Sequence, residues 1–299
     1  MNIKIILLII SFLFSQDTFS IVAIDPETGQ IGSAGASCIA GSIIISDIHP
    51  GLGAIHTQSY WTGINQNYAS NLMEMGYSPD DIIDSLISND SGNNSSIRQY
   101  GVVSIYDNEV RSSAFTGENC FDYKGHILGE TYAIQGNILL GSEVLEEMEN
   151  RFLNTDGELS EKLMASLQGA NIPGADIRCI DDNISSLSAF IRIANTYDQE
   201  GDYFLDLNVN NVEFVGYHID PIDSLQVLFD EWYLNNLDYT LGDINQDQNI
   251  DILDVVSIIN IILNIYSPSL IEMFSADINE DQIINIQDII ILIAIILDD

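Results

Sequence analysis

A twelve-residue pattern of oxygen-bearing side chains occurs twice near the C-terminal end of the chain, beginning at Asp243 and again at Asp277. Each copy is followed by an apolar run of helical length. Calcium binds about six to eight oxygen atoms, and a loop of this kind supplies them from alternate residues and one main-chain carbonyl group. The repeat therefore predicts a small module of two loops and their helices that holds two calcium ions. The predicted calcium-binding residues are Asp243, Asn245, Asp247, Asn249, Asp251, Asp254, Asp277, Asn279, Asp281, Ile283, Asn285 and Asp288.

The sixth position of both loops differs from the usual calcium loop. Glycine ordinarily makes the sharp turn there, because it has no side chain to oppose a positive φ. Gln248 and Gln282 occupy this position here. We therefore expect each loop to make its tight turn without glycine.

The charge of the chain argues against whole classes of partner. Its 45 Asp and Glu residues outnumber its 8 Lys and Arg residues, which gives a formal net charge of −37, and no Lys or Arg follows Arg192. Nucleic-acid binding requires basic groups that neutralise phosphates, and anionic membranes attract basic segments. We therefore expect no nucleic acid and no anionic membrane as a partner. Solubility or a saline habitat is a second explanation of the acidity.

The first 16 residues have the features of a secretory signal peptide. Lys4 supplies a positive charge, Ile5–Phe14 is apolar except for Ser11, and Ser15 is small enough to precede a cleavage site. The apolar run is too short to span a bilayer. A buried first strand is the alternative. We expect removal of residues 1–16 and a secreted or cell-surface location in a bacterium.

The three cysteines, at positions 38, 120 and 179, have no Cys-x-x-Cys spacing. A zinc site is therefore not expected. One disulfide with one remaining thiol is one interpretation for an exported chain. Three small buried core residues are the other.

Segments with strand periodicity and segments with helix periodicity occur in groups along the chain. The predicted strands are 19–24, 30–37, 53–59, 101–106, 109–115, 186–193 and 204–209. The predicted helices are 79–87, 142–153, 158–167, 221–234, 255–263 and 289–297. Such grouping favours an α+β fold in which packed sheets are flanked by helices, not a regular βαβ alternation. The predicted organisation is a large domain at 17–234, a linker at 235–241 and the calcium module at 242–299.

The segment Thr18–Gly29 reads Thr-Phe-Ser-Ile-Val-Ala, then Ile and Asp-Pro-Glu-Thr-Gly. Further short motifs follow in order at Gly53–Ala54, Thr57–Gln58, Arg98–Gln99, Thr116–Gly117, Cys120, Gly125–His126, Gln135–Leu139, Gly141, Asp176, Arg178, Ser188–Ala189 and Asp206–Leu207. This series resembles the domain of unknown function family 1028, placed within the N-terminal-nucleophile hydrolase superfamily, and it covers about residues 18–229. The resemblance implies a four-layer αββα sandwich.

The superfamily also implies a mechanism, in which a Thr, Ser or Cys at the mature N-terminus is the nucleophile and its own α-amine is the general base. Thr18 matches the opening threonine of the family. An α-amine has a pKa of about 8, so a useful fraction accepts a proton near neutrality. Neutral side-chain amides could donate to an oxyanion. The Arg and Asp residues that match the family have a catalytic or a structural role. The catalytic residues implied by the resemblance are Thr18, Gln58, Gln135, Asn137, Arg98 and Asp176, acting on a small-molecule or peptide amide.

Cleavage after Ser15 alone would not produce this nucleophile. Gln16 and Asp17 would still precede Thr18, whose nitrogen would then be an amide that cannot act as a base. Catalysis therefore requires cleavage at the Asp17–Thr18 bond. The alternative is a non-catalytic surface or scaffold protein that uses the same fold as a binding platform. Residues 179–185 also differ from the shorter, glycine-containing segment of the family.

The paired calcium loops resemble the type I dockerin, a module that binds cohesin domains. Leu253–Asp254 and Gln287–Asp288 replace the Ser-Thr type pairs that cohesins often contact. The resemblance implies attachment through a cohesin-like or cell-surface partner. A calcium-stabilised module that packs on its own neighbouring domain is the alternative, and a homo-oligomer is compatible with the sequence.

Overall fold

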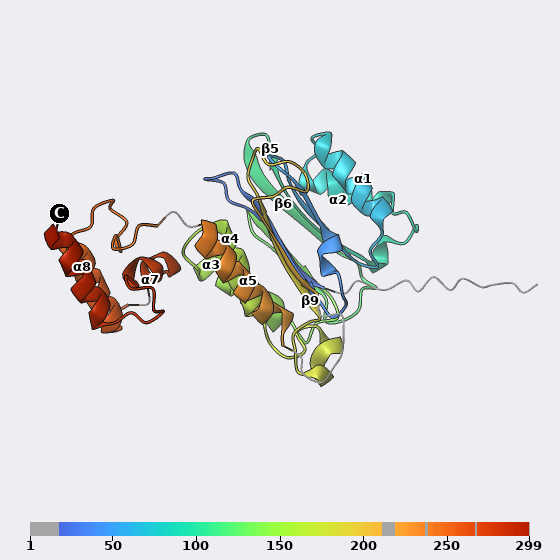
Figure 1. Ribbon diagram of the computed structural model, residues 1–299. Coiled ribbons are helices and arrows are strands. Elements are labelled where there is room, and N and C mark those ends of the chain that lie inside the picture. The colour runs from blue at the N-terminus through green and yellow to red at the C-terminus, as the bar shows by residue number, and fades with distance from the viewer. Residues whose placement is uncertain (1–17, 211–218, 237–238, 267, 299) are drawn as a thin grey trace, which may run out of the picture. The chain divides into compact units, whose positions relative to one another are not determined.

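Two antiparallel sheets form the centre of the N-terminal unit (Figure 1). The computed structural model describes residues 18–210, 219–236, 239–266 and 268–298. The chain divides into two compact units between Phe229 and Asp230. The expected signal peptide, residues 1–16, lies outside the described residues.

The first strand of the chain lies inside the larger sheet. That sheet has the order β10-β9-β2-β1-β8-β7 and consists of β1 (Phe19–Ile24), β2 (Ile31–Ser37), β7 (Gly125–Leu128), β8 (Tyr132–Gly136), β9 (Ser188–Ala194) and β10 (Leu205–Asn210). The smaller sheet has the order β3-β4-β5-β6 and consists of β3 (Ser46–His49), β4 (Gly53–Ser59), β5 (Arg98–Tyr106) and β6 (Glu109–Thr116). Since β1 has hydrogen-bonded neighbours on both sides, the residue before it is held between β2 and β8.

Helices cover the outer faces of both sheets. The pair α1 (Gly63–Glu74) and α2 (Pro79–Ser88) packs on the smaller sheet, and the pair α3 (Glu143–Asn154) and α4 (Leu159–Gly169) packs on the larger one. The inner faces of the two sheets pack against each other. The expected α+β fold, a four-layer αββα sandwich, is confirmed. Short 3₁₀ helices occur at η1 (Ser42–Ile45), η2 (Ser95–Ile97) and η3 (Ile177–Asp182), and α5 (Pro221–Asn236) begins in this unit.

The start of α2 follows from its sequence. The Ser78 hydroxyl accepts a hydrogen bond from the main-chain N–H of Asp81 at 3.2 Å, and Pro79 occupies the first turn. Proline is suited to that position because its missing N–H would have no helical partner there. The neighbouring α1 was not predicted, nor were β3, β7, β8 and α7 (Leu270–Ala276).

The space between the two sheets has an apolar half and a polar half. Alternation along β1 directs Ser20, Val22 and Ile24 toward the smaller sheet. Around Val22 and Ile24 the contacts are apolar, with Val103 and Ala133 among them. Around Ser20, at the other end, they are polar. The N-terminal end of β1 therefore opens into a hydrogen-bonded interior.

A disulfide joins Cys38, just after β2, to Cys179 in η3. Cys120 is a buried thiol whose Sγ atom donates to the Arg98 carbonyl oxygen at 3.3 Å. Of the two interpretations of the cysteines, one disulfide with one remaining thiol is the correct one.

The C-terminal unit consists of helices joined by the two predicted calcium loops. Its helices after α5 are α6 (Ile252–Ile262), α7 and α8 (Ile286–Asp298). Ile244, Val255, Ile258 and Leu292 form its small core with Ile261 and Ala276. The helices α6 and α8 start three residues earlier than predicted, because the last loop positions already form the first helical turn. No helix in the described ranges combines the length and apolar character that a bilayer span requires.

Candidate functional site

Thr18 lies immediately before β1 and is fully buried. Its carbonyl oxygen accepts hydrogen bonds from the Asn137 main-chain N–H at 3.1 Å and from Gln58 Nε2 at 3.2 Å. Asn137 follows β8 in the larger sheet, and Gln58 lies on β4 in the smaller one. Thr18 is therefore held by both sheets. Alternation along β1 places its side chain on the same inner face as that of Ser20.

A glutamine that was not among the predicted site residues connects the two amides at Thr18. Gln99 Oε1 accepts hydrogen bonds from Gln58 Nε2 at 2.7 Å and from Asn137 Nδ2 at 2.9 Å. Gln99 is opposite Gln58 in the antiparallel pair β4–β5. Its place in the Arg98–Gln99 motif, as a polar residue in a buried strand, was the sequence signal that could have identified it.

The third predicted amide, Gln135, joins the network one step further from Thr18. Gln135 Nε2 donates to Ser20 Oγ at 2.7 Å, and Ser20 Oγ donates to Gln58 Oε1 at 2.6 Å. Gln135 Nε2 also lies 3.2 Å from His56 Nδ1. The network therefore continues from Thr18 into the space between the sheets.

His56 is a neutral member of this network. Burial, with a smaller effect from the positive charge of Arg192, lowers the pKa of His56 to about 3. Its Nε2 atom lies 2.6 Å from Ser33 Oγ, which lies 2.7 Å from Ser46 Oγ. A neutral imidazole donates through one nitrogen and accepts through the other, so His56 can link Gln135 to Ser33.

Gly101 makes room for Gln135. A Cβ atom at position 101 would lie 1.9 Å from Gln135 Oε1. Since Ser20 and His56 hold the Gln135 side chain in place, it cannot move at low cost. We expect Gly101→Ala to lower the free energy of unfolding by about 1–3 kcal/mol, the usual cost of overpacking. Denaturant unfolding tests this, with Gly63→Ala as the control because a Cβ atom there makes only ordinary contacts, at 3.5 and 3.8 Å from the Trp61 ring. Equal losses in both variants would contradict it.

Residues that follow two of the amides have strained backbones. Ser59, after Gln58, has φ 63°, and Ile138, after Asn137, has φ 56°. Positive φ is unfavourable for residues other than glycine, and particularly for a β-branched one. Such strain persists only where surrounding structure imposes it, and it is concentrated at functional sites. This observation favours the Thr18 end of the sandwich as the functional end.

Asp176 lies at the same end of the larger sheet, where it supports the chain beside Thr18. It is fully buried, and its Oδ2 atom accepts from the Cys38 main-chain N–H at 2.9 Å. Arg178 Nη2 donates to the same oxygen at 2.6 Å. Cys38 follows Ser37, the β2 residue next in register toward Thr18. The contacts of Asp176 fix this strand end.

The structure does not bring Arg98 into the network around Thr18. Its Nε atom forms an ion pair with Asp90 Oδ1 at 2.7 Å, and its Nη1 atom donates to the Tyr60 carbonyl oxygen. Both side chains of the ion pair are buried. These contacts assign Arg98 to the support of the loop before β5.

The Asp90–Arg98 pair predicts a pH dependence of stability. Although burial opposes it, hydrogen bonds from Arg98, Asn94, Asn65 and Gly92 lower the pKa of Asp90 from 3.8 to about 2. A carboxyl with a depressed folded-state pKa stabilises the protein above its unfolded-state pKa, and this stabilisation is lost as the pH falls toward the folded-state value. We expect the free energy of unfolding to fall by about 2 kcal/mol between about pH 4 and about pH 2 because this stabilisation is lost.

The measurement is the free energy of unfolding against pH for the wild-type protein and Asp90→Asn. The advantage of the wild type should shrink by that amount on acidification. The exposed Asp156→Asn is the control and should keep the wild-type slope. A constant difference between wild type and Asp90→Asn across this range would contradict the assignment.

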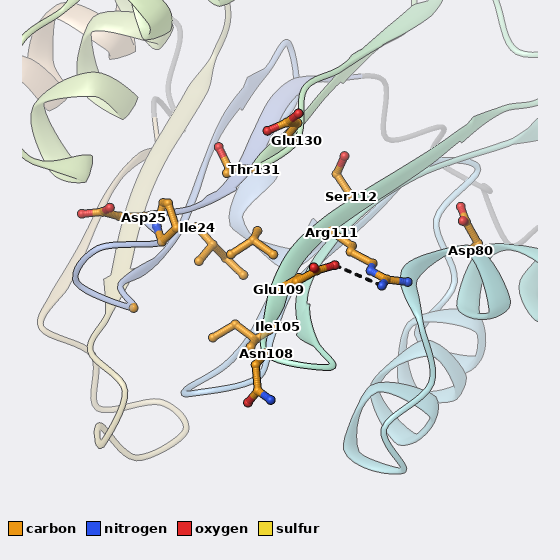
Figure 2. A pocket seen from close by; sticks show the side chains of 13 residues that line it. Ile24, Asp25, Asp80, Ile105, Asn108, Glu109, Arg111, Ser112, Glu130 and Thr131 are labelled. Carbon is orange, nitrogen blue, oxygen red and sulfur yellow. Dashed lines mark hydrogen bonds and ion pairs between the residues drawn. The ribbon is translucent and has the colours of Figure 1, made fainter.

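A cavity of about 760 Å³ lies elsewhere (Figure 2). It reaches Ile24 at the opposite end of β1, roughly 20 Å from Thr18 at the usual rise per strand residue. Asp80, Glu109 and Arg111 line it, and the last two form an ion pair at 3.2 Å. This cavity therefore lies at the end of the sandwich where a short turn joins β5 to β6.

The two predicted calcium loops share one hydrogen-bond pattern. Asp243 accepts from the main-chain N–H groups of Asp247 and Gln248 at 3.1 and 2.9 Å. At the equivalent positions of the second loop, Asp277 accepts from those of Asp281 and Gln282 at 3.1 and 2.7 Å. Gln248 has φ 68° and Gln282 has φ 67°. The expectation that both turns form without glycine is confirmed.

The donor set of the loops fits a divalent cation. Asp254 and Asp288, at the last loop positions, are fully buried carboxylates, and the sequence has no Lys or Arg after Arg192. A buried carboxylate requires a cation or several hydrogen bonds. Main-chain N–H groups of Ile244, Asn245 and Asp251 donate to Asp254, and those of Asn279 and Asn285 donate to Asp288, so calcium would add positive charge to carboxylates that are already hydrogen-bonded. No three His, Cys, Asp or Glu side chains converge into a preformed metal cluster within the described parts of the chain.

Comparisons with known proteins agree with the division into two units. Residues 241–297 match the model of the dockerin type I domain. Domains of this type bind calcium, typically bind cohesin partners, and occur in extracellular or cell-surface proteins. No curated protein matches the chain.

Solved structures provide three further similarities. A protein of Silicibacter pomeroyi, described as a member of family DUF1028, is 24% identical with a TM-score of 0.58, over 73% of this chain and 89% of that one. The ancestral β-subunit Anbu of Yersinia bercovieri is 10% identical with a TM-score of 0.37, over 73% and 94%. An Anbu mutant of Hyphomicrobium is 10% identical with a TM-score of 0.40, over 75% and 99%. The first shows a shared fold, and the two Anbu similarities are too low to support a conclusion.

The remaining comparison concerns the αββα sandwich itself. Residues 18–222, well over half of the chain, match the model described as a family of unknown function, DUF1028. The match begins at Thr18, the residue on which the amide network converges. The chain therefore belongs to the family of unknown function DUF1028.

Proposed function

We propose that this protein is an exported amide-bond hydrolase whose nucleophile is the Thr18 hydroxyl group. The observation that carries the proposal is the convergence of Gln58 and Asn137, from different sheets, on the Thr18 carbonyl oxygen. This arrangement fixes the main chain of Thr18 at the end of β1. A fixed nucleophile beside oriented amide groups is what acyl transfer requires.

The reaction proceeds in two balanced steps. Thr18 Oγ1 attacks the amide carbon of the substrate, its proton passes to the Thr18 α-amine, and the amine transfers a proton to the departing nitrogen as the C–N bond breaks. Water then adds to the resulting ester, and its cleavage releases the acid and restores the hydroxyl. An α-amine suits this role because its pKa is about 8.

The amides beside Thr18 have separate roles in the proposal. The Nε2 atom of Gln58 and the main-chain N–H of Asn137 hold the Thr18 carbonyl oxygen, so they orient the nucleophile. Gln135 acts through Ser20 to hold Gln58. Asp176 supports the neighbouring strand end, and Arg98 supports the loop before β5. The substrate is a small-molecule or peptide amide.

The α-amine of Thr18 becomes available only when the Asp17–Thr18 bond is cleaved. Intact-mass measurement and N-terminal sequencing of the secreted protein test this requirement. We expect a chain that begins at Thr18. A chain that begins at Gln16, together with unchanged amidase activity in Thr18→Ala, would contradict the proposal.

A second candidate function, a non-catalytic binding platform, is favoured by one observation. Thr18 is fully buried, whereas a nucleophile must be reached by its substrate. Turnover of any acyl amide that is lost in Thr18→Ala would exclude this alternative.

The C-terminal module is proposed to bind two calcium ions and to attach the protein to a cohesin-like or cell-surface partner. The equivalent hydrogen bonds of its two loops support one ion in each loop. Calcium would neutralise the buried carboxylates there, and the predicted ligands of the two loops would hold it.

A further inference from the structure

Gln99 has an orientation that two main-chain carbonyl groups fix. Its Nε2 atom lies 3.0 Å from the Gly125 carbonyl oxygen and 2.8 Å from the Gly136 carbonyl oxygen. Main-chain carbonyl groups can only accept hydrogen bonds, so the NH₂ group must face them. Gln99 Oε1 must therefore face Gln58 and Asn137.

This orientation sets that of Asn137, and for Gln58 it acts together with the Thr18 carbonyl oxygen, to which Gln58 Nε2 donates at 3.2 Å. Because Gln99 Oε1 accepts, both Gln58 and Asn137 turn their NH₂ groups toward it. Gln58 Oε1 then faces Ser20 and accepts from its hydroxyl at 2.6 Å. Ser20 Oγ, having donated its proton, accepts from Gln135 Nε2 at 2.7 Å.

The same logic assigns the tautomer of His56. Gln135 Nε2 also lies 3.2 Å from His56 Nδ1 and 3.3 Å from the Ser20 carbonyl oxygen, and its NH₂ group cannot accept a hydrogen bond from the ring. Nδ1 is then the acceptor of the neutral ring and Nε2 carries the proton, which it donates to Ser33 Oγ at 2.6 Å. The proton position on a buried imidazole therefore reports the orientation that Gln99 imposes.

Two buried amide oxygens of the network, those of Asn137 and Gln135, have no hydrogen-bond partner among the described residues, and the first lies at the Thr18 end. Asn137 is adjacent to Thr18, because its main-chain N–H donates to the Thr18 carbonyl oxygen at 3.1 Å. A buried amide oxygen without a hydrogen-bond partner is costly. A hydrogen-bond donor at the reacting centre would remove this cost.

We infer that Gln99 is a positioning residue, which orients Gln58 and Asn137 so that Asn137 Oδ1 is the acceptor for a hydrogen-bond donor at Thr18. This role rests on the proposed hydrolase function, and its structural part is measurable without turnover. Gln99 acts through these two amides, which donate hydrogen bonds to its Oε1 atom.

The first test is ¹⁵N NMR of the His56 imidazole in the full-length protein. We expect a single tautomer protonated on Nε2 in the wild type and a mixture of tautomers in Gln99→Met, which removes the anchor while preserving the chain length. Gln168→Met is the matched control, since Gln168 lies on α4 and bonds Gln226 at 3.2 Å, outside the network. A single Nε2-protonated tautomer in Gln99→Met would overturn the inference, whether or not the wild type turns over an amide.

Gln99→Glu provides a second, nearly isosteric variant if the methionine variant does not fold. Burial raises the pKa of a carboxyl group, and a protonated carboxyl can still donate to one carbonyl and accept from the amides. We expect the wild-type His56 spectrum at about pH 5 and its loss as the pH rises toward about 9. A pH-independent wild-type spectrum in Gln99→Glu would overturn the inference.

Turnover then separates the inference from the proposed function. We expect kcat of Gln99→Glu to fall about 10²-fold across this pH range relative to the wild type, with little change in KM, the loss expected for a misplaced catalytic group. A tautomer change with unchanged kcat would overturn the positioning role. Absence of turnover in the wild type would instead contradict the proposed function and leave the His56 measurement to decide the orientation.

Discussion

Thr18→Ala is expected to lower kcat/KM for amide hydrolysis on the order of 10⁴-fold or more, because it removes the attacking oxygen while leaving the α-amine in place. Thr18→Ser retains the oxygen and is expected to remain within about tenfold of the wild type. The measurement is steady-state hydrolysis of a panel of acyl amides by protein whose mature N-terminus has been established by mass. Because Thr18 is fully buried, loss of a hydroxyl and a methyl group is expected to lower the free energy of unfolding by about 1–2 kcal/mol.

Thr155→Ala is the matched control for this experiment. Thr155 caps the C-terminal end of α3 through its main-chain N–H, so its side chain is outside the amide network. Its kcat/KM should equal that of the wild type. Equal activity in wild type, Thr18→Ala and Thr155→Ala would remove Thr18 from the mechanism and favour the binding platform.

Chelation of calcium is expected to unfold the C-terminal module while the αββα sandwich remains folded. With two sites and free calcium at about 100 times each Kd, bound metal adds about 5 kcal/mol to the stability of the module. The physical reason is that the buried Asp254 and Asp288 carboxylates have no cationic side chain in the module. Hydrogen exchange with and without EDTA should show loss of protection confined to residues beyond Gly242.

Single substitutions separate the two loops. Asp243→Asn and Asp277→Asn change the first ligand of the first and second loop, and calorimetric titration should then find one ion instead of two. Asp84→Asn, at an exposed position of α2, is the control and should retain two. Equal melting of the wild-type module with calcium and with EDTA would contradict the expectation.

The sequence was sufficient for features that depend on neighbouring residues. The capped start of α2 at Ser78 and Pro79, the hairpin of β5 and β6, and the paired loops beginning at Asp243 and Asp277 all depend on local side chains, and the structure contains them. The layered arrangement was also predictable, because grouped strands must pack their buried faces together.

Features that depend on distant residues were not predictable in the same way. The helix α1 is rich in Asn and buries only a narrow face around Ala69, Leu72 and Met73, so its sequence lacks a strong helical pattern. The orientation of Gln99 depends on the carbonyl oxygens of Gly125 and Gly136, which only the packing of the two sheets brings to it. Arg98 is a residue type that often acts in catalysis, and its ion pair with Asp90 becomes visible only in the three-dimensional structure.

The disulfide between Cys38 and Cys179 has a practical consequence for production of the protein. It joins positions 141 residues apart and borders the Asp176 contacts that hold the strand end beside Thr18. A reducing cytoplasm keeps such thiols unpaired, so material made in that compartment would lack this covalent tie. Enzymatic screening is therefore best performed on protein that has folded in an oxidising compartment.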